Sequence, residues 1–251
     1  MENDTLTIAL ILVSVVSTIA LFANWAGNRH IPGLLIISLG FAFTSVGILL
    51  LTTQGTASPV ISILLANALI LGGRIPVVLG LAQFWNQEQS KIPIVATAGY
   101  FLTMTGFYYF TLVDDDMLWR IRIYTLMMVS YALCNIYLIA NGLRIEKKLR
   151  PVMAVSSNFG AFLALMLFSF NAVTEFILMM VRSGAPLTNA DEGTSFLLLG
   201  SIFTMVVFAF AIIIMTMEEL SVEHKENSIY DPITTILNHR TFLEVGQRIL
   251  G

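Results

Sequence analysis

The sequence predicts an all-α integral membrane protein, a bundle of seven transmembrane helices. Hydrophobic residues make up 57% of the 251 residues and charged residues only 12%. The mean hydropathy is +0.82. Soluble domains are about 45–50% apolar and about 25% charged. The apolar residues also fall into runs of the roughly 20 residues that a helix needs to cross a bilayer.

Seven such runs follow one another, and turn residues or charges separate them. The first follows Glu2 and Asp4 instead of a basic segment, so we interpret it as a span and not a cleaved signal peptide. Pro32 and Pro151 stand at helix starts, where a missing N–H costs nothing. The predicted spans are about Leu6–Asn24, Gly33–Thr52, Val60–Phe84, Ile92–Phe110, Trp119–Asn141, Pro151–Val181 and Thr194–Met217.

The distribution of charge predicts the orientation. Basic residues concentrate in the cytoplasmic loops of membrane proteins. With the N-terminus outside, the cytoplasmic side receives Arg29, Lys91 and the basic loop 144–150, whereas the outer side receives Asp114–Asp116, Asp191 and Glu192. We therefore expect the C-terminus in the cytoplasm and loop 144–150 against anionic lipid headgroups. The protein itself is expected to be a multi-pass protein of a bacterial inner membrane.

Three glycines of the second span, Gly33, Gly40 and Gly47, are each seven residues apart and share one face. Glycine on a membrane helix lets another helix approach closely. This stripe predicts tight helix packing.

Four ionisable residues lie inside the predicted spans, where charge is costly and faces the bundle or a wet cavity. Glu175 lies near the outer surface and is expected to pair with Arg122 or Arg120. Arg74 lies about 20 Å into the third span at 1.5 Å per residue, too deep for Glu175 to reach comfortably. Carbonyls, amides, tyrosines, water or an anionic ligand must satisfy it.

Polar residues accompany these charges at helical spacing, on faces that could line one cavity. Three readings stay open: a structural hydrogen-bond network, a cavity for a small anionic or amphiphilic ligand, and an ion pathway. The candidate ligand-binding residues are Asn67 and Arg74 of the third span, Arg120, Arg122, Tyr124, Tyr131 and Asn135 of the fifth, and Asn171 and Glu175 of the sixth.

Other chemistries find little support in the sequence. The three histidines have no partner at metal-ligand spacing, so we predict no metal site. The single cysteine, Cys134, lies in an apolar run and is expected to be a small buried hydrophobe. The last span holds no lysine, which excludes a retinal Schiff base there. We expect no nucleic-acid partner.

The chain after the last span divides into two further parts. Residues 218–229 continue with good helix formers and predict a short cytoplasmic stalk, which Asp231–Pro232 ends. The predicted organisation is therefore a transmembrane domain over 1–217, a signalling helix over 218–229, and the beginning of a soluble domain over 230–251.

The segment "DPITTILNHRTF" resembles the opening motif of GGDEF domains, which is roughly Asp-x-Leu-Thr-x-Leu-x-Asn-Arg-Arg-x-Phe. Asp231, Thr234, Asn238, Arg240 and Phe242 match, Ile233 and Ile236 replace the two leucines, and His239 replaces the first arginine. The order of spans, stalk and motif is also similar to membrane-sensor diguanylate cyclases. The catalytic turn of that family does not occur here, so we expect no activity of this chain by itself and a longer natural protein.

The resemblance implies the input module of a cyclase that makes cyclic di-GMP from GTP with Mg²⁺, working as a homodimer in membrane lipid. This chain itself is expected to hold no cofactor. The alternatives are a small-solute transporter or channel, in which Arg74 and Glu175 lie on the pathway, and a structural membrane scaffold.

Overall fold

The computed structural model describes residues 3–87, 91–149, 160–161, 163–170 and 190–229. Throughout these ranges the ordered elements are helices and no strand occurs. Five helices there are long and apolar enough to cross a membrane, which confirms an all-helical protein of membrane-spanning character. These five are Asp4–Gly27, Leu34–Leu51, Val60–Phe84, Met117–Ile145 and Leu198–His224.

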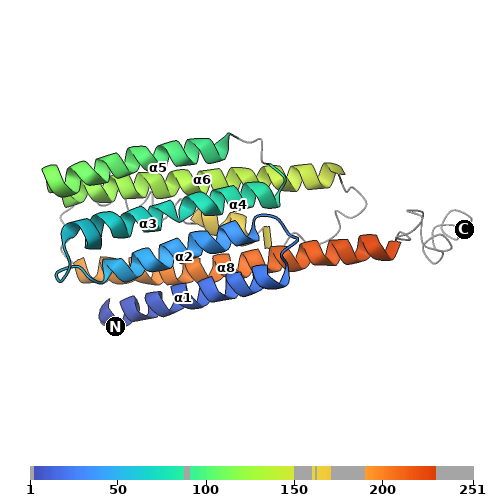
Figure 1. Ribbon diagram of the computed structural model, residues 1–251, viewed down its shortest axis with the longest axis horizontal. Coiled ribbons are helices and arrows are strands. Elements are labelled where there is room, and N and C mark those ends of the chain that lie inside the picture. The colour runs from blue at the N-terminus through green and yellow to red at the C-terminus, as the bar shows by residue number, and fades with distance from the viewer. Residues whose placement is uncertain (1–2, 88–90, 150–159, 162, 171–189, 230–251) are drawn as a thin grey trace, which may run out of the picture.

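The helices run roughly parallel or antiparallel along the long axis of the molecule (Figure 1). Helix α1 (Asn3–Gly27) packs against α2 (Leu34–Leu51) and against α8 (Ala190–Ile229). On the other side of α2 lies a third span in three pieces, and beyond it α5 (Ile92–Tyr108) packs on α6 (Met117–Leu149). The third span comprises η1 (Val60–Leu65), α3 (Ala66–Gly72) and α4 (Arg74–Phe84).

The predicted fourth and sixth spans are not among these five helices. Helix α5 has 17 α-helical residues, at the lower limit of about 17 for crossing a bilayer, and continues as the π-helical turn η2 (Tyr109–Val113). Most of the predicted sixth span lies outside the described residues, which include only its helical residues 160–161 and 163–170. Seven spans and their orientation therefore remain predictions.

The glycine stripe of α2 packs directly on the third span, as the sequence predicts. A Cβ added to Gly40 would lie 2.5 Å from the Gly73 carbonyl oxygen, and one added to Gly73 would lie 2.5 Å from the Gly40 oxygen. Gly33 meets Gly80, and Gly47 meets Ala66, in the same way. The contacts thus repeat every seven residues on both helices, and the two backbones touch along their length.

The other helices join α2 through polar and aromatic contacts. The Ser45 hydroxyl donates to the Ser14 carbonyl at 3.0 Å and lies 2.9 Å from the Thr18 hydroxyl, which links α1 to α2. In the core, Phe41 stacks on Phe208 of α8 with ring centroids 5.5 Å apart. Because α8 contacts both α1 and the centre of α2, it is an integral part of the bundle.

Helix α8 leaves the bundle without a break. It runs from Ala190 to Ile229, so the predicted stalk continues the last span as one helix. Figure 1 shows its carboxyl end extending past the end of α1, at the opposite end of the molecule from the N-terminus. The first turns of the extension are still packed, since Val222 is 2% exposed and Leu220 contacts the main core.

Candidate functional site

The candidate site begins at a discontinuity in the third span. Helix α3 ends at Gly72, Gly73 forms a turn, and α4 starts at Arg74. Pro76 has no N–H to donate to the Gly72 carbonyl, so the hydrogen-bond ladder is interrupted beside the arginine. Interrupted helices deep in a membrane occur where side chains or a cavity satisfy the backbone. Arg74 therefore lies where the backbone hydrogen bonds of the third span are interrupted.

Arg74 faces the middle of α6. The Nε atom of Arg74 is buried and makes no hydrogen bond with the described residues. Helices α4 and α6 pack on each other with Trp85 against Gly142. Eleven residues earlier on both helices, this register brings Arg74 level with Tyr131. The Tyr131 hydroxyl is also buried without a hydrogen-bond partner in the described chain, and Tyr131 is only 2% exposed. Two buried donors thus lack an acceptor in the described chain.

Asn135 lies one turn beyond Tyr131 on the same face of α6. It is 2% exposed, and its Oδ1 atom has no hydrogen-bond partner among the described residues. From α5, Tyr100 donates to the Ala68 carbonyl at 3.2 Å and covers Gly72. Arg74, Tyr131 and Asn135, which we call the Arg74 site, therefore combine two unpaired donors and one unpaired acceptor.

The structure places the other predicted ligand-binding residues in contacts of their own. The Asn67 amide donates to the Ile63 carbonyl of the preceding turn at 2.8 Å. Arg120 forms an ion pair with Asp115 at 3.0 Å, just before α6 begins. Arg122 lies over the Trp119 ring, 5.0 Å from its centroid. These three side chains have partners, so Arg74 is the one candidate arginine that keeps an unpaired buried donor.

Of the three remaining predicted residues, the structure describes Tyr124 alone. Tyr124 is half-buried and packs against the main core. Asn171 and Glu175 lie outside the described residues, so their predicted contacts with the arginines stay predictions. The described residues also contain no group of His, Cys, Asp and Glu that could hold a metal ion.

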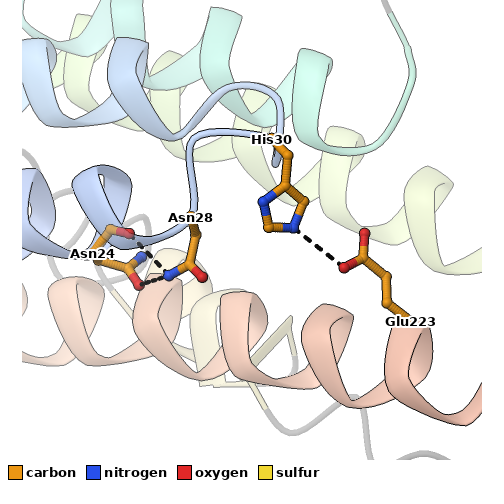
Figure 2. A network of polar contacts seen from close by, with 4 residues as sticks. All are labelled: Asn24, Asn28, His30 and Glu223. Atoms are coloured by element: carbon orange, nitrogen blue, oxygen red, sulfur yellow. Dashed lines mark hydrogen bonds and ion pairs between the residues drawn. The ribbon is translucent and has the colours of Figure 1, made fainter. Parts of the chain in front are cut away.

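A second polar region lies where α1 and α8 pass the end of the bundle. The Asn24 amide donates to the buried Thr216 hydroxyl at 2.9 Å. Figure 2 shows His30, just after α1, pointing at Glu223 of α8, with 3.2 Å between Nε2 and Oε2. Asn28 caps the region by donating to the Asn24 carbonyl at 2.9 Å. We call the Asn24–Thr216 and His30–Glu223 pairs the α8 contacts.

A third polar group, at the end of α4, was not predicted from the sequence. The Gln87 amide donates to the Leu138 carbonyl at 2.7 Å and accepts from the Asn141 amide at 2.7 Å. A Cβ on Gly142 would lie 2.4 Å from the Trp85 ring, so that ring packs directly on the α6 backbone. In the sequence, polar residues at the end of a span are expected to face water, so the sequence did not indicate that Gln87 joins α4 to α6.

No protein-family model, curated protein or solved structure matches this chain. The geometry of these sites and the short motif after α8 are thus the grounds for a functional proposal.

Proposed function

We propose that the chain is the transmembrane input module of a diguanylate cyclase, whose GGDEF domain begins at the motif over residues 230–251. The observation that carries the proposal is the unbroken α8. This helix packs on α1 and stacks Phe208 on Phe41 of α2, extends past the bundle, and ends at Ile229, next to the motif.

A continuous helix is a stiff connection between two ends of a molecule. A displacement or rotation of α8 within the membrane would reach residue 229 because each backbone hydrogen bond couples neighbouring turns. The extension would then present the two GGDEF domains of a homodimer to one another in a different geometry. Such a geometry could control whether two GTP molecules, each with its Mg²⁺, meet.

The α8 contacts are suited to define two positions of the extension. His30 and Glu223 are 55% and 40% exposed, and such exposed pairs contribute about 0–1 kcal/mol. A contact of that size is easily exchanged for water. A ligand has to bind one of the two positions more tightly in order to shift the balance between them. At the Arg74 site a small anionic or amphiphilic ligand would find unpaired partners beside a positive charge.

The experiment is to express the complete natural reading frame that contains this chain, purify the product in lipid nanodiscs, and measure cyclic di-GMP formed from GTP and Mg²⁺. The proposal expects synthesis by the wild-type protein. A reading frame without a GGDEF turn after residue 251, or an intact product that forms no cyclic di-GMP, would refute it.

A transporter or channel is a second candidate, and the interrupted third span is the feature that favours it. Secondary transporters often bind substrate at discontinuous helices near the membrane midplane. Flux of small anions into protein-containing vesicles, compared with empty vesicles, tests this candidate. Saturable uptake that is lost in Arg74→Gln would favour transport over signalling.

A further inference from the structure

We infer that the Arg74 site binds a singly charged oxygen anion through the Nε–H of Arg74 and the hydroxyl of Tyr131. This inference rests on the proposed function and narrows its ligand. Nine residues form the predicted site, whereas the structure leaves three of them with unpaired buried polar atoms. The relevant chemistry is a carboxylate or a phosphate diester, either free in solution or as the headgroup of an amphiphile.

The first step concerns charge. Arg74 carries a positive charge in the middle of a span, and charged side chains there pair with other groups or line a wet cavity. No ion pair joins it to a carboxylate of the described chain, where Asp115 pairs with Arg120 and Glu223 with His30. An anion supplied from outside the chain would neutralise Arg74.

The second step concerns hydrogen bonding. Buried polar atoms in native proteins nearly always have partners, and each orphan calls for an explanation. Arg74 Nε–H and Tyr131 O–H both donate, and both lack an acceptor in the described chain. Oxygen anions accept hydrogen bonds from both kinds of donor, and bonds to an ionised acceptor are about twice as strong as neutral ones. One anionic oxygen pair would satisfy both residues.

The third step limits the charge of the ligand. Asn135 presents an unpaired carbonyl oxygen, Oδ1, one turn from Tyr131. A dianion would be repelled by this partial negative charge in a low-dielectric interior. Beside a monoanion, a water molecule or a hydroxyl group of the ligand would instead donate to Oδ1. The site therefore favours a single negative charge.

The test uses this chain in nanodiscs of neutral phosphatidylcholine and labelled octanoate as the probe. Equilibrium dialysis measures saturable binding, with empty nanodiscs subtracted and octanol as the uncharged competitor of equal length. We expect octanoate but not octanol to compete. Arg74→Gln should weaken binding roughly 10- to 100-fold and Tyr131→Phe roughly 3- to 10-fold. Arg29→Gln is the matched control, since its guanidinium lies over the Trp25 ring and outside the candidate site, and should bind like the wild type.

A second readout locates the ligand and does not depend on the folding of Arg74→Gln. In arginine-labelled protein, the ¹H–¹⁵N signal of Arg74 Nε should shift on addition of octanoate, and the shift should shrink in Tyr131→Phe. The inference would be overturned if the Arg74 signal of the wild-type protein did not shift on addition of octanoate, acetate or phosphate. So would Arg74→Gln protein that binds octanoate with wild-type affinity.

Competition by small anions separates the two sources of the ligand. Displacement of octanoate only by longer-chain carboxylates assigns the site to a membrane amphiphile, whereas displacement by millimolar acetate or phosphate assigns it to a free anion. Binding is measured without any cyclase. An inactive parent enzyme would therefore refute the proposed function and leave the anion site standing, and an active enzyme with no anion binding would do the reverse.

Discussion

Replacing Gly40 by alanine should separate α2 from the third span. A Cβ at this position would lie 2.5 Å from the Gly73 oxygen, 3.0 Å from a Val77 methyl and 3.3 Å from Pro76. Real Cβ atoms essentially never approach closer than 3.0 Å, and the nearest atom belongs to the backbone, so no side chain can swing away. The two helices must move apart.

The size of the effect follows from two opposing terms. Overpacking a close contact costs about 1–3 kcal/mol. Alanine in a helix is itself favoured over glycine by about 0.5–1 kcal/mol. Gly200→Ala isolates the second term, because nothing lies within 4 Å of a Cβ there and the residue is exposed on α8. Because the helix-propensity gain is the same in both variants, it cancels, and we expect Gly40→Ala to be less stable than Gly200→Ala by roughly 1–3 kcal/mol.

Both substitutions add the same methyl group to an apolar helix, so their effects on membrane insertion cancel. The assay is reversible unfolding in mixed micelles with increasing dodecyl sulfate, followed by far-ultraviolet circular dichroism. Gly73→Ala, on the other side of the same contact, should behave like Gly40→Ala. Equal stability of Gly40→Ala and Gly200→Ala would refute the close approach of these backbones.

Three further outcomes are expected, two in the same unfolding assay and one in hydrogen exchange. Gln87→Leu should lose about 1–3 kcal/mol because the Asn141 amide and the Leu138 carbonyl lose their buried partner, while Gln54→Leu at an exposed position stays within about 0.5 kcal/mol of wild type. A double-mutant cycle of Asn24→Ala and Thr216→Val should give a coupling of about 0.5–1.7 kcal/mol, and additive effects would show that their 2.9 Å contact contributes nothing. Glu223→Gln should leave global stability within about 1 kcal/mol yet speed hydrogen exchange after residue 217, and unchanged exchange would mean that the His30–Glu223 pair does not hold α8.

The sequence was most informative where one physical rule dominates. Apolar runs must be helical in a bilayer because their backbone groups have no other partners, so five predicted spans are recovered as helices, Val60–Phe84 with the predicted ends and the other four with shifted ends. The spacing of Gly33, Gly40 and Gly47 predicted close packing because residues seven apart lie on the same face of a helix, and glycine on that face lets another helix approach. The same spacing in Ala66, Gly73 and Gly80 would have identified the partner helix.

The sequence was less informative about which polar residues meet. Depth in the span separated Arg74 from Arg120 and Arg122, but the sequence did not show that Asp115 and Trp119, close to them along the chain, contact the latter two. Contacts between distant segments were harder to foresee. His30 and Glu223 are 193 positions apart, and only the packing of α8 on α1 brings them together.

The central claim is that a ligand at the Arg74 site moves the extension of α8. It is tested most directly by the distance between the end of α1 and that extension, with and without ligand. Spin labels at Ala26→Cys and His224→Cys, both exposed, can be introduced in a Cys134→Ala background and measured by pulsed electron paramagnetic resonance in nanodiscs. We predict that octanoate shifts the distance distribution in the otherwise wild-type chain and leaves it unchanged with Arg74→Gln. Saturable octanoate binding without any change in this distance would contradict the coupling of the site to α8.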